Sequence, residues 1–322
     1  MTKFSAAMAA LLVGLASPVA AMAQEYPQRP IRMVVPFAAG GGTDVLARVV
    51  AGALAERLKQ QVVVENRGGA GSVSGTDAVA KSEPDGYTIL FTSVAYAINP
   101  GVYRKLPYKS ADLVPVAMAG SAPLVLVMHP SVPAKDLPEL LALLKANPGK
   151  YNYGSSGNGT TLHMAAEMFR SMAQVDIVHV PYRGAAPAMT DLISGNVSFV
   201  FDQVTTAAPF VDDGKLKAIG VSTKTRSSLL PGTPTMHEAG LSGYETYTWN
   251  VIAVPRGTPQ PIVDRLNAET YAVMGSAQMN KRFSELGAET SKPASPAEVA
   301  AFVESETAKF RAIAKSAGVS IE

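Results

Sequence analysis

The sequence has no cysteine among its 322 residues and only one tryptophan. Without cysteine the chain forms no disulfide framework and no thiolate metal site, and a lipoprotein anchor has no attachment point. An excess of one charge is also missing, because 28 basic residues stand against 26 acidic ones and no basic run resembles a phosphate-binding arm. We therefore expect no nucleic acid partner.

Long apolar runs are missing after the first segment of the chain. Residues 1–23 have the pattern of a secretory signal peptide, with a positive Lys3, an apolar run over 4–16, and small residues before a cleavage site after Ala23. The run is too short and too interrupted to serve as a permanent membrane anchor. We expect export through the inner membrane and a soluble, periplasmic mature protein.

The remaining composition is that of an ordinary globular protein, with 47% hydrophobic and 17% charged residues. A length near 300 residues favours two lobes over one core. Apolar β-rich runs alternate with helical patterns, which predicts an α/β fold with a mainly parallel sheet. The strands are expected at residues 31–35, 62–64, 87–92, 124–128, 151–153, 175–180, 197–201 and 216–221, and the helices at 43–58, 73–81, 137–146, 160–172, 187–194 and in most of the chain after 258.

Three strand-to-helix loops are the candidate binding elements, at residues 36–44, 153–161 and 181–187. Such loops gather at the carboxyl ends of the strands, where α/β proteins bind ligands. Glycine allows close backbone approach, and helix N-termini present a partial positive charge. The three loops together predict an anion-binding mouth, although glycine before a helix is also ordinary turn chemistry. Asp44 has a second interpretation, because an acid in the first helical turn is stabilised by the helix dipole.

Fingerprints of nucleotide sites and of serine hydrolases fail in this sequence. Val45 stands where a dinucleotide loop from Gly40 needs glycine, and Asn158 replaces the last glycine of a nucleophile elbow. His163 and Glu167 could share a helix face, but two ligands without a visible third fit a structural pair better than a metal. We expect binding without catalysis, no metal and no cofactor.

Several short motifs occur in a family-specific order through nearly the whole mature chain: 34–37 with Gly40, Gly41 and Asp44; 65–67; 84–88; 153–157; 179–184; Gly195 with Asp202; Trp249; Pro255; and 257–259. In this order the sequence resembles the Bug proteins, the periplasmic substrate-binding components of tripartite tricarboxylate transporters.

The resemblance implies a type II periplasmic-binding-protein fold, with two Rossmann-like lobes joined by two crossing strands. The first lobe would comprise residues 24–122 and 252–322, and the second residues 123–251. The cleft between them would capture a small organic carboxylate, and the protein, a monomer, would deliver it to membrane permease subunits of the transporter.

The family's ligand site can be carried over residue by residue. Its ligand-binding positions are expected at Phe37, Ala39, Gly40, Gly41, Gly42, Thr43, Asp44, Ser155, Ser156, Gly157, Thr160, Arg183, Gly184 and Asp202. The segment 94–96 departs from the small polar residues usual in the family, and it would make the cleft more apolar if it lined the cleft.

Two other functions remain open from the sequence alone. The liganded lobes could present a carboxylate to a membrane histidine kinase, as a sensor does. An exported hydrolase is the other alternative, and it would depend on Ser156 as the nucleophile.

Overall fold

The computed structural model describes residues 26–317 and 319–321, so the predicted signal peptide and its cleavage site lie outside the described residues. Within those residues, no helix combines the length and apolarity needed to cross a membrane. The strands are β1 (Ile31–Val35), β2 (Val62–Asn66), β3 (Thr88–Ser93), β4 (Leu113–Met128), β5 (Asn152–Ser155), β6 (Val178–Pro181), β7 (Phe199–Gln203), β8 (Lys217–Val221), β9 (Tyr247–Pro255) and β10 (Glu289–Thr290). The α-helices are α1 (Gly42–Leu58), α2 (Val73–Ala80), α3 (Ala95–Val102), α4 (Leu137–Ala146), α5 (Thr161–Ala173), α6 (Ala185–Ile193), α7 (Val204–Asp212), α8 (Gln260–Met274), α9 (Ala277–Glu285) and α10 (Pro296–Ala317).

The strands follow one another in the order β2-β1-β3-β9-β4-β7-β5-β6, with β10 and β8 also pairing with β4. The outer strands are parallel, since β1 pairs with β2 and β3, and β5 pairs with β6 and β7. The centre is antiparallel, because β9 runs against both β3 and β4. The prediction of a mainly parallel sheet is therefore right for the outer strands and wrong for the centre.

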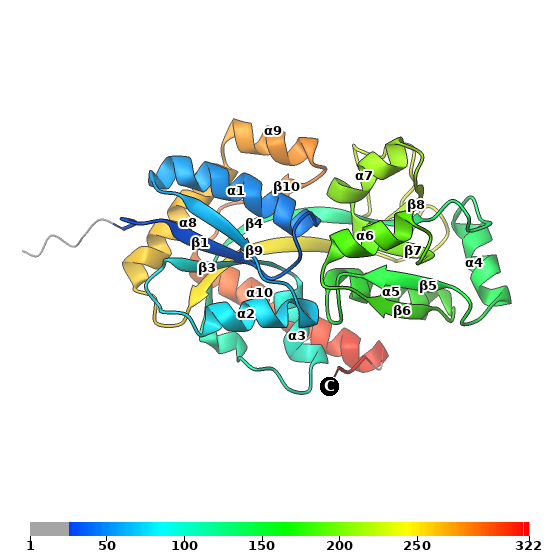
Figure 1. Ribbon diagram of the computed structural model, residues 1–322, viewed down its shortest axis with the longest axis horizontal. Coiled ribbons are helices and arrows are strands. Elements are labelled where there is room, and N and C mark those ends of the chain that lie inside the picture. Colours follow the sequence, from blue (N-terminus) through cyan, green and yellow to red (C-terminus); the bar gives the residue numbers. More distant parts are fainter. Residues whose placement is uncertain (1–25, 318, 322) are drawn as a thin grey trace, which may run out of the picture.

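Strand β4 connects the two halves of the molecule. Its residues 113–123 pair with β9, and its residues 124–128 pair with β7 and β8. Figure 1 shows β4 and β9 passing together between the halves. The sequence predicted only the second part of β4 as a strand. Pro115 and Gly120 normally interrupt strands, and here both lie at register shifts, where strands tolerate them.

The hydrophobic cores lie on the two sides of this crossing. One core takes its buried residues from positions 124–244. Two further cores take theirs from positions 31–122 and 249–314, with Met164 as the exception. We call the elements around the latter two cores the first lobe, and those around the former the second lobe.

We propose lobe boundaries at residues 122/123 and 251/252. The first boundary has support from the change of core between Ala122 and Leu124. Near the second boundary, Trp249 and Val251 already pack into a first-lobe core, because β9 crosses gradually rather than at one residue.

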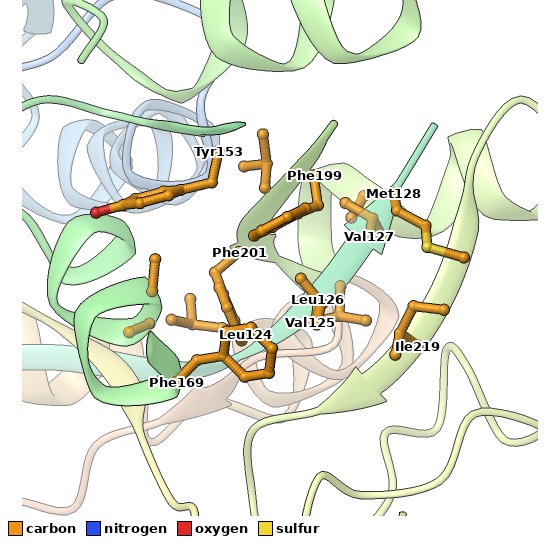
Figure 2. Packing of buried hydrophobic residues seen from close by; sticks show 14 of the residues in the cluster. Leu124, Val125, Leu126, Val127, Met128, Tyr153, Phe169, Phe199, Phe201 and Ile219 are labelled. Carbon is orange, nitrogen blue, oxygen red and sulfur yellow. The ribbon is translucent and has the colours of Figure 1, made fainter. Parts of the chain in front are cut away.

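Aromatic rings form much of the second-lobe core and lie beside residues 124–128 of β4 (Figure 2). The Phe169 ring lies 5.7 Å from the Phe201 ring, and the Tyr153 ring lies 6.2 Å from the Phe199 ring, measured between centroids. Complete burial of one such side chain contributes about 2 to 3 kcal/mol. Close packing of this kind holds β5 and β7 in fixed positions, and the loops that follow them are positioned accordingly.

Candidate functional site

A cavity of about 20 Å³ lies between the lobes. Its volume corresponds to about one water molecule, so the structure has the two lobes in close contact. The five predicted site residues in its wall are Phe37, Gly41, Gly42, Thr43 and Ser156. The remaining lining residues are Ser93, Thr161, Leu162, Ala185, Gln203 and Thr248.

Helices α1, α3, α5, α6 and α7 all begin at or beside this wall. Gly42, Thr161 and Ala185 are the first residues of three of them, Gln203 is the N-cap of α7, and Ser93 lies two residues before α3. First-turn N–H groups have no partner within their helix, and the helix dipole makes this end partly positive. Among the described lining residues, none is lysine, arginine or histidine. Backbone donors therefore supply the positive potential of the site.

Hydroxyl and amide groups in the same wall are left without partners. Within the described part of the chain, Thr161 Oγ1, Gln203 Oε1 and Thr248 Oγ1 are buried and have no hydrogen-bond partner. A buried polar atom left unpaired costs about 1 to 3 kcal/mol. The wall is therefore suited to a polar guest that forms several hydrogen bonds at once.

Glycines of the loops let the two lobes approach each other. A Cβ at position 68 would lie 2.8 Å from the Arg183 carbonyl oxygen, and a Cβ at Gly71, where φ is +58°, would overlap the Asn158 carbonyl oxygen. Ala38 N donates to the Arg183 carbonyl oxygen at 3.3 Å, which joins the lobes at the backbone. Glycine at positions 68 and 71 therefore permits the close approach of the two lobes.

The predicted site residue Asp44 shapes the first loop. Its Oδ2 accepts hydrogen bonds from Gly40 N at 2.9 Å and from Arg48 Nε at 3.0 Å, and its Oδ1 accepts one from Asn66 Nδ2 at 2.8 Å. Burial alone would raise the pKa of this carboxyl, but these donors outweigh burial and lower the pKa below its ordinary value. Asp44 is therefore an ionised anchor that fixes the loop conformation.

The predicted site residue Ser155 lies in a histidine cluster in which His163 is buried and His179 is half-buried. Its Oγ lies 2.6 Å from His179 Nε2 and accepts a hydrogen bond from Gly157 N at 3.1 Å. The His179 ring stacks on the His163 ring at 4.2 Å between centroids. Burial, followed by the neighbouring His163, lowers the pKa of His179 to about 3, so that ring is neutral at neutral pH. Ser155 is fully buried, so its contacts with His179 and Gly157 N stabilise the conformation of the second loop, residues 153–161.

His163 and Glu167 have separate structural partners. His163 Nδ1 accepts from Gly159 N at 3.2 Å, while Glu167 accepts from the Tyr153 hydroxyl at 2.7 Å and pairs with Arg170. Among the described residues there is no group of three or more His, Cys, Asp or Glu placed to hold a metal ion. Both residues therefore stabilise the second lobe.

The other predicted site residues are dispersed around the cavity. Thr160 is the N-cap of α5, Gly184 is the N-cap of α6 and packs on Ala38, and Ala39 is exposed at the tip of the first loop.

Two larger cavities are lined by the remaining predicted site residues. A groove of about 460 Å³, which we call the outer groove, is lined in part by Gly157 and Arg183. A pocket of about 200 Å³ is lined in part by Gly40, Gly41 and Asp202.

The segment 94–96 does not line the cavity. Val94 and Ala95 are completely buried in first-lobe cores, and so is most of Tyr96. The condition under which these residues would make the cleft more apolar is therefore not met, because their side chains pack into the first-lobe cores and Ser93 is left at the cavity.

Gln203 and Thr248 are lining residues that sequence reasoning missed. Gln203 ends β7 and Thr248 lies on β9, and neither belongs to a glycine-rich loop. These two residues lie close together because β7 and β9 both pair with β4 where the strands cross between the lobes. No local sequence motif could therefore have identified them. Thr161 and Ala185, in contrast, lie within the predicted loops 153–161 and 181–187, and Leu162 directly follows the first of these.

Comparison with known proteins gives a consistent result. A family model described as tripartite tricarboxylate transporter family receptor matches residues 46–319. A UPF0065 protein encoded between tcbD and tcbE of Pseudomonas sp. strain P51 is 39% identical over 288 residues, which cover 89% of this chain and 85% of the relative. Protein BugT of Bordetella pertussis is 36% identical over 312 residues, covering 96% of this chain and 95% of the relative.

Solved structures share the fold. The periplasmic binding protein BugD has a TM-score of 0.89 at 35% identity, covering 92% of this chain and 100% of its own. The adipate-bound protein Rpa4515 of R. palustris has a TM-score of 0.88 at 36% identity, covering 92% and 99%. MatC of Rhodopseudomonas palustris, with bound malate, has a TM-score of 0.85 at 31% identity, covering 89% and 99%. The predicted two-lobed periplasmic-binding-protein fold is thereby confirmed.

Proposed function

The chain belongs to the tripartite tricarboxylate transporter receptor family, and on that premise we propose that it captures a small organic carboxylate between its lobes and delivers it to permease subunits in the membrane. The membership confirms the resemblance found in the sequence motifs. Members and structural neighbours are solute-binding proteins, and this chain is one as well, rather than an enzyme.

The observation that carries the proposal is the meeting of helix N-termini around one cavity without a cationic side chain. Gly42 of α1 comes from the first lobe, whereas Thr161 of α5 and Ala185 of α6 come from the second. A carboxylate between them would accept hydrogen bonds from both lobes at once and so favour the closed form. Micromolar affinity needs about 8 kcal/mol, and several charge-assisted hydrogen bonds of about 1.5 to 3 kcal/mol each are sufficient.

The family also supports a proposal for the cellular location of the protein. We propose a periplasmic protein, exported by the segment 1–23 and present as a monomer. Its carboxylate would pass to the permease when the lobes open. Deleting the gene and measuring uptake of the identified carboxylate tests the delivery step, since a receptor that only signals would leave uptake unchanged.

Ligand class is tested by thermal shift and calorimetry against mono-, di- and tricarboxylates, amino acids and neutral sugars. We expect stabilisation by a carboxylate and none by neutral compounds. Stabilisation by neutral sugars alone would refute the proposal.

The location of the site is tested by removing cavity hydroxyls singly. Ser156→Ala and Thr161→Val each take one hydroxyl from the cavity wall, so each should weaken the best carboxylate about tenfold, the value of one lost hydrogen bond. Ser228→Ala is the matched control, because Ser228 is exposed and lines a separate groove beside Pro123 and Tyr247. Equal affinities of all these variants would place the ligand elsewhere.

A further inference from the structure

A second pocket, of about 200 Å³, adjoins the small cavity and shares Gly41 and Ala185 with it. A Cβ at position 41 would lie 3.4 Å from the Ala185 Cβ, so these two residues are close together at the boundary that the two spaces share. A small opening of the lobes would join them. The rest of the wall comes from the first loop and from β7, α6 and α7: Gly40, Ala186, Met189, Thr190, Ile193, Asp202, Thr206 and Phe210.

The second pocket differs from the small cavity in its chemistry. Met189, Ile193 and Phe210 give it apolar walls, whereas the small cavity has hydroxyls and helix N-termini. Among the described residues that line the second pocket, Asp202 alone has an ionisable side chain. The small cavity, with its hydrogen-bond donors, therefore favours a negatively charged group, whereas the second pocket, with the Asp202 carboxylate, favours a hydrogen-bond donor or a positively charged group.

Asp202 is completely buried at the end of β7. Its Oδ2 accepts a hydrogen bond from Thr206 Oγ1 at 2.6 Å, and its Oδ1 has no partner within the described part of the chain. A buried carboxylate oxygen is stabilised by a donor, and the remaining side chains of this wall are apolar or are the hydroxyls of Thr190 and Thr206. The Gln203 backbone N–H also acts on this carboxylate, and Oδ1 remains the acceptor that a donor on the ligand would reach once the lobes open slightly, since the atom is buried in this structure.

We propose that the second pocket receives the far end of the ligand and that this end carries a hydrogen-bond donor, so that the preferred ligand is a monocarboxylate with an apolar body and a terminal ammonium or hydroxyl group. The inference rests on the proposed function, in which the carboxylate end lies in the small cavity. A second carboxylate at the far end would face the charge of Asp202 between apolar walls, where like charges repel strongly. Dicarboxylates of the same length are therefore disfavoured.

The test compares four ligands of equal length: 6-aminohexanoate, 6-hydroxyhexanoate, hexanoate and adipate, titrated calorimetrically at about pH 8. Shorter and longer members of each series are included, so that a mismatch in length is not mistaken for a mismatch in chemistry. In the wild-type protein at its best length, we expect the donor-terminated ligands to bind at least tenfold more tightly than the dicarboxylate.

Two variants should abolish or reverse that preference. Asp202→Asn removes the charge, and Ile193→Lys adds a cation to the partly exposed wall of the pocket without changing Asp202; each should improve the dicarboxylate relative to the amino acid by at least tenfold. Asp213→Asn, at an exposed carboxylate paired with Lys215, is the control and should leave the ratio unchanged.

Wild-type protein that binds dicarboxylates as tightly as donor-terminated ligands at every length would overturn this inference and leave the proposed function intact. An unchanged ratio in the folded variants would do the same. If no carboxylate of any kind binds, the proposed function itself fails.

Discussion

The two buried carboxylates beside the cleft, Asp44 in the first lobe and Asp202 in the second, have opposite environments. Asp44 is surrounded by donors from Gly40, Arg48 and Asn66. Asp202 accepts from Thr206 and has one oxygen without a partner. Burial acts on both, but donors outweigh it at Asp44 and lower the pKa, whereas at Asp202 burial raises the pKa to about 6.

The difference in environment gives the two residues different roles: Asp44 fixes the conformation of the first loop, whereas Asp202 has an oxygen left to bind a ligand. The charge of Asp44 is already neutralised by its own lobe, so the first loop is held in shape before ligand arrives. Asp202 has only the Thr206 hydroxyl and the Gln203 backbone as donors and no cationic partner, and it lines one pocket with Gly40 and Gly41 of the other lobe. Residue type alone does not distinguish these roles, because both are aspartates next to a helix N-terminus.

The largest effect is expected from preventing the close approach of the two lobes. In Gly71→Ala the new Cβ would overlap the Asn158 carbonyl oxygen of the second lobe, so the lobes cannot meet fully. We expect carboxylate affinity to fall at least 100-fold, which corresponds to about 2.7 kcal/mol. Small-angle scattering should show that ligand no longer compacts the protein.

The matched control for this variant is Gly214→Ala. Gly214 also has a positive φ, of +68°, but a Cβ there meets no atom within 4 Å. It carries the same backbone strain without the contact between lobes. Equal loss of affinity in both variants would show that strain, rather than blocked closure, is responsible.

The next effect concerns the pH dependence of stability at Asp202. Because the folded protein holds this proton up to about pH 6, whereas the ordinary pKa is 3.8, the folded state binds more protons in between. Stability from this group is therefore greatest below pH 3.8 and falls as the pH rises through 6. Between pH 4 and pH 7.5 the loss amounts to about 2 kcal/mol.

Asp202→Asn should remove this slope. Urea unfolding of the wild-type protein and the variant at both pH values measures it, and the free energy of unfolding of the variant should gain about 2 kcal/mol relative to wild type across the range. Parallel pH profiles of the two proteins would contradict the prediction.

The same substitution at Asp44 should act in the opposite direction. In Asp44→Asn an amide nitrogen must replace one of the oxygens, so it faces Gly40 N or the Asn66 amide, donor against donor. We expect a loss of about 1.5 kcal/mol in the free energy of unfolding at neutral pH. Since the folded pKa is lowered, the wild-type advantage should be present above pH 3.8 and disappear in more acidic solution.

Asp213→Asn is the control for this pair of variants. Its partner Lys215 is exposed, as is Asp213 itself, and such surface pairs contribute well under about 1 kcal/mol. If Asp44→Asn were no more destabilising than Asp213→Asn, the anchoring role of Asp44 would be refuted.

Much of the fold was accessible from the sequence because the outer strands and their helices are local patterns. Helix α1, for example, begins at Gly42, one residue before the predicted start, and ends at the predicted Leu58. The antiparallel centre was not accessible, since the pairing of β4 with β9 joins residues more than a hundred positions apart and passes through Pro115 and Gly120.

The candidate site divides in the same way. Glycine-rich loops identified Gly41, Gly42 and Ser156, because their function depends on backbone donors next to them in the chain. Gln203 and Thr248 reach the cavity only through the crossing of the strands. The roles of Asp44 and Asp202 required knowledge of their neighbours, because hydrogen bonding and burial, rather than position in a loop, decide which carboxylate is already compensated.

The smallest effect is expected at Arg183, the one cation in the predicted loops of the second lobe. Its side chain is exposed and lines the outer groove with Gly71 and Asn158, while its carbonyl oxygen accepts from Ala38 N across the lobes. Arg183→Ala keeps that backbone contact and removes only a solvated charge, so affinity should change less than threefold. Its charge can still attract an anion, and stopped-flow association should slow about twofold at low salt and not at high salt. A tenfold loss of affinity that persists at high salt would instead place the guanidinium on the bound carboxylate.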